Sequence, residues 1–356
     1  MAGAFMANLS FYLEQAVKDG ASDIFIIAGG PVSEKLGGRL KKLGEERLLP
    51  PDTRALITDI YETAQRDMAR YVSCGDDDFS FAVPGLARFR VNAYMQRGSF
   101  AAVVRVVSFT IPDYKAIRIP ERIMELAEAD HGMILVTGTA GSGKTTTQAC
   151  LIDKINKTRD CHIVTLEDPI EFLHRNDKSI ISQREIAVDT ADYLSALRAC
   201  LRQAPDVILL GEMRDPETIR TALTAAETGH LVIGTLHTKG AVNSIDRIID
   251  SFQSEQQAQI RMMLSAVLRT VVSQELVPGT SGERVPAFEV MHVNNAIRSM
   301  IRDNKNHQIN NAIAAGGSEG MITMDQAMIE LCRNGMITKE TAVDYAYTPD
   351  LVARQL

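Results

Sequence analysis

The chain has 356 residues, of which 45% are hydrophobic and 23% are charged, and its formal net charge is −7 at pH 7. This length predicts two domains with a substantial buried core. The negative charge argues against a general nucleic-acid-binding protein, which would carry a basic surface, and the sequence has no run of about 18 apolar residues that would cross a membrane.

The first part of the chain mixes helical and strand patterns. Apolar residues at helical spacing predict a helix over residues 8–19 and a second helix over residues 51–70, which has a proline at its start. Between them, a short β-rich run covers residues 23–28. This order predicts an α+β domain.

A strand pair is predicted after the second helix. Over residues 86–94 apolar side chains alternate with polar ones, among them Arg88 and Arg90, which predicts a half-buried strand with a basic outer face. The chain then turns at residues 96–99 and returns as a strand over residues 100–107.

Residues 108–120 show no periodicity and contain Pro112 and Pro120. Proline and the loss of a period are typical of a connecting segment, so we expect an interdomain linker here. The chain is therefore expected to have an N-terminal domain over residues 1–107 and a second domain over residues 121–356.

Four short apolar runs in the second domain predict buried strands, at residues 133–137, 162–166, 206–210 and 231–236. They are separated by stretches long enough for helices, which predicts a parallel sheet covered by helices on both faces. Ligands of such sheets bind at the carboxyl ends of the strands.

Beyond Gln253 the chain is predicted to be helical. Ser254 and Thr323 are each followed three residues later by glutamine, which is the spacing of a helix-capping box. Gly335 is expected to follow the end of a helix.

The segment GTAGSGKT directly follows the first of the four strands and precedes a helical pattern. Glycine lets such a loop curl so that its backbone N–H groups point at a phosphate chain. In this arrangement Lys144 reaches the β- and γ-phosphates of a nucleotide and Thr145 holds Mg²⁺. The predicted nucleotide-binding residues are Gly138, Thr139, Ala140, Gly141, Ser142, Gly143, Lys144, Thr145 and Thr146.

The three later strands each meet polar residues at an end. Glu167 and Asp168 follow the second strand, Glu212 follows the third, and His230 and His237 flank the fourth. A carboxylate in such a position is often only a helix cap or a surface ion pair, and a lone histidine is usually structural. Their occurrence together with a phosphate-binding loop favours a phosphoryl-transfer site, which needs a carboxylate beside Mg²⁺ and a group that positions water.

In order and spacing, four segments resemble the Walker A, Asp box, Walker B and His box of the secretion ATPases, which drive type II secretion, type IV pili and type IV secretion. These segments are GTAGSGKT, TLEDPIEF, GEMRD and TGHLVIGTLHT. Similarity extends to GLARFRVNAYMQRGSFAAVVR and AIRSMIRD, and within the family the chain is most similar to the type IV pilus retraction ATPases. The resemblance implies an α/β fold, with a PAS-like N-terminal domain and a RecA-like ATPase domain.

The same resemblance implies catalytic roles. Glu212 corresponds to the glutamate that activates water, and Glu167 to the acid that assists with Mg²⁺ and water. His230 corresponds to the His-box residue near the γ-phosphate, and Lys144 to the Walker A lysine.

Four arginines lie in the region that supplies the family's contacts to a nucleotide across a subunit boundary. They are Arg88, Arg90, Arg97 and Arg105. We count Arg97 and Arg105 among the catalytic candidates, whereas a solvated strand face explains Arg88 and Arg90 equally well.

By resemblance, the protein is a homohexamer that uses ATP and Mg²⁺ at the cytoplasmic face of the inner membrane. Its expected partners are a pilus platform protein in that membrane and, indirectly, pilin, with no nucleic acid and no membrane contact of its own. The alternatives are a pilus-assembly or type IV secretion ATPase, and an ATP-binding regulatory ring that does not turn ATP over.

The five cysteines, at positions 74, 150, 161, 200 and 332, are scattered and form no C-x-x-C pair. We expect reduced, mostly buried thiols. Pilus-assembly relatives commonly carry a four-cysteine zinc site in the C-terminal domain, and its lack here favours retraction.

Overall fold

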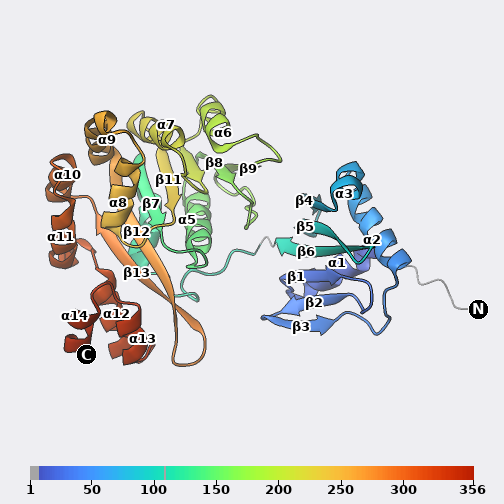
Figure 1. Ribbon diagram of the computed structural model, residues 1–356. Helices are drawn as coiled ribbons and strands as arrows, with labels where there is room; N and C mark the ends of the chain where they lie inside the picture. The colour runs from blue at the N-terminus through green and yellow to red at the C-terminus, as the bar shows by residue number, and fades with distance from the viewer. Residues whose placement is uncertain (1–7, 108–109) are drawn as a thin grey trace, which may run out of the picture. The chain divides into compact units, whose positions relative to one another are not determined.

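The computed structural model describes residues 8–107 and 110–356, and the chain divides into two compact units with the main boundary between Thr110 and Ile111 (Figure 1). The predicted linker includes residues 108 and 109, which lie outside the described residues. Among the helices of the described part, none has the length and apolar character needed to cross a bilayer.

The first unit is a six-stranded antiparallel sheet in the order β3-β2-β1-β6-β5-β4. Helices α1 and α2 contribute Leu13 and Leu56 to a core with Ile24, Phe89 and Val104 of the sheet. Its elements are α1 (Leu9–Asp19), β1 (Asp23–Ile26), β2 (Ser33–Leu36), β3 (Arg39–Lys42), α2 (Pro50–Thr63), α3 (Ala69–Cys74), β4 (Asp76–Val83), β5 (Ala87–Gln96) and β6 (Ser99–Val107).

The first predicted helix is confirmed as α1, but the second ends earlier than expected. Helix α2 stops at Thr63, the backbone turns at Gln65 with a φ of 51°, and a separate helix α3 begins at Ala69. Strand β3 was not predicted, because all four of its residues are exposed and it therefore lacks the apolar alternation that marks a half-buried strand.

The second unit contains a seven-stranded sheet in the order β13-β12-β7-β11-β10-β8-β9, and only β13 runs antiparallel to its neighbour. The strands are β7 (Gly132–Thr137), β8 (His162–Glu167), β9 (Ile180–Glu185), β10 (Val207–Leu210), β11 (Leu231–Leu236), β12 (Leu268–Pro278) and β13 (Arg284–His292). The predicted parallel sheet is confirmed by this order.

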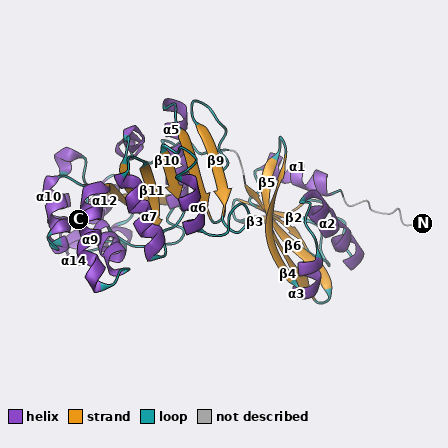
Figure 2. Ribbon diagram, turned by 90° about the horizontal axis from the view of Figure 1, so that it is seen from above, coloured by secondary structure: helices purple, strands orange, loops and turns teal. Residues whose placement is uncertain are grey.

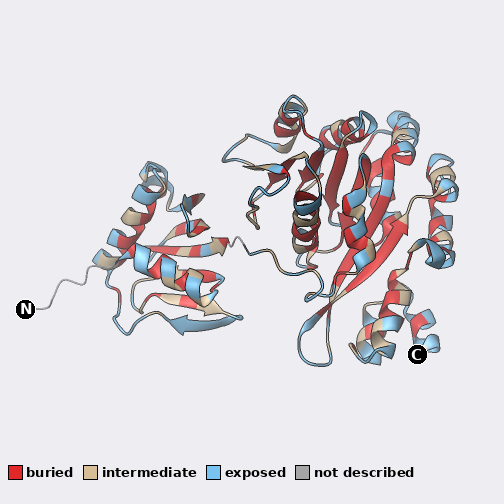
Figure 3. Ribbon diagram, turned by 180° about the vertical axis from the view of Figure 1, so that it is seen from behind, coloured by how far each residue is buried: buried red, intermediate tan, exposed pale blue. Residues whose placement is uncertain are grey.

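Helices cover both faces of this sheet (Figure 2). Alternate residues of β7 divide between the two faces: Ile134 packs with Leu151 of α5 on one, and Leu135 lies with Leu223 of α7 on the other. Its central strands are buried, as the red ribbons in Figure 3 show. The helices are α4 (Glu121–Met124), α5 (Lys144–Thr158), α6 (Tyr193–Cys200), α7 (Pro216–Glu227), α8 (Ala241–Asp250), α9 (Ser254–Val267), α10 (Asn295–Arg302), α11 (Ile309–Ala315), α12 (Met324–Arg333), α13 (Lys339–Asp344) and α14 (Pro349–Gln355).

The prediction of an all-helical segment beyond Gln253 is wrong, because β12 and β13 form a long hairpin within it. Strand β12 carries three consecutive polar residues, Ser273 to Glu275, and all three are buried. They interrupt the apolar run by which a buried strand is recognised.

Smaller expectations in this region had mixed outcomes. The capping box of Thr323 and Gln326 is confirmed at the start of α12, and Gly335 follows that helix with a φ of 71°. Ser254 is the first residue of α9 and not its cap. All five cysteines are free, as expected, but only Cys150 and Cys200 are buried.

Candidate functional site

The predicted phosphate-binding loop connects β7 to α5, and two of its glycines face β12 closely. A Cβ atom at Gly138 would overlap the carbonyl oxygen of Gln274, and one at Gly143 would lie 2.7 Å from the Gln274 side-chain nitrogen. Both glycines also have positive φ angles, of 142° and 90°. Glycine is therefore required at position 138 because the β12 backbone packs directly against the loop, and it is favoured at position 143 by the positive φ angle.

Lys144 is the first residue of α5 and is only 7% exposed. Its Nζ donates hydrogen bonds to the carbonyl oxygens of Gly138 and Thr139, at 2.9 and 2.7 Å, and lies 3.5 Å from Nδ1 of His237. Burial lowers the pKa of Lys144, whereas the nearby carboxylates of Glu212 and Glu275 oppose this shift. The ammonium group is thus held inside the loop, where a bound phosphate chain would meet it.

Glu212 lies just beyond the carboxyl end of β10. One of its carboxylate oxygens is 2.6 Å from Nη2 of Arg214, and the other is 3.4 Å from Nε2 of His237. Burial acts to raise the pKa of Glu212, but the contacts with Arg214 and His237 outweigh it and leave the pKa below its ordinary value. Glu212 is therefore an ionised carboxylate that can accept a proton.

Glu167 is the last residue of β8, the neighbour of β10 in the sheet. Its Oε1 accepts hydrogen bonds from Oγ1 of Thr165 at 2.6 Å and from the side chain of Gln183 at 3.2 Å. Because the amide of Gly211 donates to the carbonyl of Leu166, Glu167 and Glu212 leave the same edge of the sheet on adjacent strands. The structure therefore brings the two predicted acids to one edge.

The structure does not bring His230 to the phosphate-binding loop of its own chain, where the role expected for it would place it. His230 precedes β11, and its carbonyl accepts from the amide of Gly132 at the start of β7. A six-residue strand spans roughly 17–20 Å, so His230 lies at the far edge of the sheet. His237 follows β11 and takes the place at the site, since it contacts both Lys144 and Glu212. The rule that ligands meet the carboxyl ends of strands selects His237 over His230.

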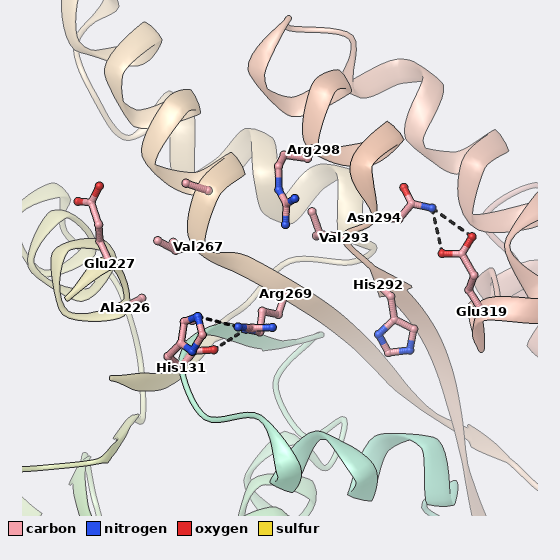
Figure 4. A pocket seen from close by; sticks show the side chains of 12 residues that line it. His131, Ala226, Glu227, Val267, Arg269, His292, Val293, Asn294, Arg298 and Glu319 are labelled. Carbon is pink, nitrogen blue, oxygen red and sulfur yellow. Dashed lines mark hydrogen bonds between the residues drawn. The ribbon is translucent and has the colours of Figure 1, made fainter. Parts of the chain in front are cut away.

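The far edge has a cavity of its own, of about 570 Å³ (Figure 4). In it Arg269 of β12 donates a hydrogen bond to the carbonyl of His131 and lies 2.8 Å from the His131 ring nitrogen. None of the predicted site residues lines this cavity. This cavity therefore does not mark the nucleotide site.

A cavity of about 350 Å³ lies beside the start of α5. Thr146 and Thr147 of α5 line one part of it, and Arg118, Leu276 and Pro286 line another. This mixture of apolar surface and a few polar groups is typical of a site that buries a small ligand. Its contact with the phosphate-binding loop suits the base and ribose of a nucleotide, and sequence reasoning missed it because its residues are far apart in the chain.

Oxygen donors suited to Mg²⁺ occur at the same edge. Thr145 offers a hydroxyl group one residue after Lys144, and Glu167 and Glu212 offer carboxylates. Hard oxygen ligands of this kind fit Mg²⁺, which is usually held by one or two protein groups together with substrate phosphates. Within residues 8–107 and 110–356, no group of three or more His, Cys, Asp or Glu residues could hold a metal by itself.

The four arginines of the first unit differ in their surroundings. Arg105 forms an ion pair with Asp23 at 3.0 Å, so its charge is partly neutralised within the unit. Arg97 is exposed in the turn between β5 and β6 and has a φ of 50°. Arg88 and Arg90 are half-buried on β5.

Comparison with known proteins finds similar sequences over most of the chain. The family model described as "Type II/IV secretion system protein" matches residues 3–283. The chain is 44% identical, over 96% of its length and 99% of the relative's, to the type IV pilus retraction ATPase PilT of Pseudomonas aeruginosa. It is also 44% identical to a twitching motility protein of Neisseria gonorrhoeae, over 86% of this chain and 82% of that one.

Solved structures agree with these matches. The crystal structure of the pilus retraction motor PilT with bound ADP superposes with a TM-score of 0.88 at 44% identity, covering 97% of this chain and 98% of that one. The ATPase DotB of Legionella pneumophila superposes with a TM-score of 0.78 at 29% identity, covering 94% of each chain. The predicted α/β fold class is confirmed by these neighbours.

Proposed function

Because the chain belongs to the type II/IV secretion system protein family, we propose that it is an ATP-hydrolysing motor that powers type IV pilus retraction. The observation that carries this proposal is the 44% identity, over nearly the full length of both chains, to a protein named as a pilus retraction ATPase. The site at the carboxyl edge of the sheet supplies the groups that ATP hydrolysis requires.

In the proposed reaction, the phosphate chain of ATP lies in the loop that precedes α5. Lys144 then exchanges its bonds to the loop carbonyls for bonds to phosphate oxygens, and Glu212 takes a proton from the attacking water. The new bond forms between the water oxygen and the γ-phosphorus, and the bond from that phosphorus to the bridging oxygen breaks to leave ADP and phosphate.

Three other residues support this step. Thr145 and Glu167 would hold Mg²⁺, which neutralises charge on the phosphates. His237 lies between Lys144 and Glu212 and would sense or contact the γ-phosphate, the role that the sequence resemblance gave to His230.

The motor is proposed to work as a homohexamer at the cytoplasmic face of the inner membrane, acting on a platform protein and only indirectly on pilin. In such a ring, an arginine of one subunit reaches the nucleotide of its neighbour. Arg97 suits this role best of the four, because it is exposed at a hairpin turn, whereas Arg105 is paired with Asp23.

The proposal is tested by replacing the native gene with the Glu212→Gln form and counting surface pili by electron microscopy while twitching is scored. Abundant pili that do not retract are expected, because assembly continues without disassembly. A bald surface would assign the chain to pilus assembly instead. Glu227→Gln, an exposed position at the end of α7, is the matched control and should leave both pili and twitching unchanged.

A further inference from the structure

Two segments that flank the site leave neighbouring strands of the sheet. One is the phosphate-binding loop after β7, and the other is the post-β11 loop, residues 237–240, which carries His237. Strand β12 lies on the other side of β7 from β11. Its buried residues Ser273 to Glu275 contact both loops, although no motif of the sequence marks them.

Ser273 and Gln274 hold the post-β11 loop and the first turn of α5 against β12. The amide of Gly240 donates to the Ser273 hydroxyl at 2.9 Å, which ties the post-β11 loop to β12. Gln274 accepts a hydrogen bond from Thr147 of α5 at 2.7 Å, and its carbonyl oxygen is the atom against which Gly138 packs. The strand is thus a common support for both loops.

Glu275 joins the loops through its charged side chain. One carboxylate oxygen lies 3.2 Å from Nζ of Lys239 in the post-β11 loop, and the other accepts a hydrogen bond of 3.3 Å from the Thr139 hydroxyl in the phosphate-binding loop. The side chain of Glu275 is only 5% exposed, whereas that of Lys239 is 54% exposed. Burying a carboxylate is unfavourable without partners, so Glu275 depends on these two contacts.

A movement of either loop therefore changes the environment of the same carboxylate. The charge of Glu275 also acts to raise the pKa of Lys144, whose ammonium group is proposed to bind the phosphate chain. On the other side, Lys239 is two residues from His237, which contacts Glu212. The contacts form a continuous route from the phosphate-binding loop to the proposed base.

We propose that Glu275 is a positioning residue that couples nucleotide occupancy of the phosphate-binding loop to the post-β11 loop, and so sets His237 against Glu212. The role rests on the proposed ATPase function, but it acts through Thr139 and Lys239 and not by contact with the substrate. Couplings between sites are typically worth about 5- to 150-fold in an equilibrium constant.

Hydrogen exchange with ADP tests the coupling without any need for hydrolysis. In the wild-type protein, ADP should slow exchange of the loop amides at residues 142–146 and also, by about tenfold, of the amides of Gly240 and Ala241, which are hydrogen-bonded to Ser273 and Glu289. In Glu275→Gln and in Lys239→Met, ADP should still slow exchange at residues 142–146. It should no longer slow exchange of the Gly240 and Ala241 amides. An equal response of Gly240 and Ala241 in wild type and both variants would overturn the proposal.

Steady-state kinetics provide a second test of the coupling. Each single variant should lower kcat by about tenfold with nucleotide affinity within threefold of wild type, and the double variant should fall no further, because both remove one interaction. Multiplied effects, near 100-fold in the double variant, would mean that the residues act independently. If wild type protects both loops with ADP but hydrolyses no ATP, the proposed function fails while the coupling stands.

Discussion

A carboxylate in contact with an arginine and a histidine is a compromise between charge and basicity. Arg214 and His237 keep Glu212 ionised, but a carboxylate with a lowered pKa is also a weaker base. The 2.6 Å contact with Arg214 therefore keeps Glu212 ionised and at the same time lowers its basicity. Movement of His237 or Arg214 away from Glu212 on ATP binding would raise its basicity at the moment when a proton must be taken.

Glu212→Gln should bind ATP with unchanged affinity and lower kcat on the order of 10²- to 10⁴-fold, because glutamine cannot accept the proton of the attacking water. Lys144→Ala should instead weaken ATP binding, since it removes the ammonium group that is held inside the loop and is proposed to bind the phosphates. Phosphate release and binding of a fluorescent ATP analogue measure the two quantities separately. Turnover by Glu212→Gln equal to wild type would remove Glu212 from the chemistry.

The two histidines that flank β11 provide a matched pair. His237→Ala should reduce kcat on the order of 10-fold or more, because His237 contacts both Lys144 and Glu212, a loss in the range of single catalytic contacts. His230→Ala should leave kcat of the assembled protein within about threefold, since His230 lies at the opposite edge of the sheet. The reverse ranking would restore the role that the sequence alone suggested.

At the scale of elements, the sequence predicts most of the strands around the proposed phosphate site. Strands β7, β8, β10 and β11 are short apolar runs, and their parallel order follows from the helices between them. Strand β12 escaped prediction because its residues at the site are polar and buried, a combination that only the tertiary contacts with the two loops explain. The partners of β12 could not be predicted for the same reason, since they lie more than 30 residues away in sequence.

Gly138→Ala is expected to weaken nucleotide binding by about tenfold or more. The added methyl group would overlap the carbonyl oxygen of Gln274 in β12, so the phosphate-binding loop would have to move away from the strand. Backbone clashes of this kind cost about 1–3 kcal/mol or more. Binding of the ATP analogue and urea unfolding would be measured together, with Gly30→Ala as the control because a Cβ there meets nothing within 4 Å. Undiminished binding by Gly138→Ala would contradict the packing described here.

At the scale of the whole molecule, the second unit carries every residue of the proposed site apart from the arginine that is proposed to come from a neighbouring subunit. The phosphate-binding loop, both carboxylates, His237 and β12 all belong to the unit that begins at Ile111. The first unit places Arg97 in the exposed turn between β5 and β6. A site completed by a neighbour's arginine gives such a residue a function and makes assembly a condition for turnover.

This arrangement predicts that two inactive variants will restore each other. Arg97→Ala subunits keep Glu212 but lack the arginine, and Glu212→Gln subunits keep the arginine but lack the base, so only a mixed ring contains complete sites. In a random one-to-one mixture, about a quarter of the sites would combine an intact core with an intact neighbour, and ATPase activity should recover to about that fraction of wild type. Specific activity should also rise with protein concentration as rings form. The mixture could prove as inactive as its components at concentrations where light scattering shows assembled rings. That result would mean that Arg97 does not complete a neighbouring site. Arg88→Ala and Arg90→Ala would then be mixed with Glu212→Gln in the same way.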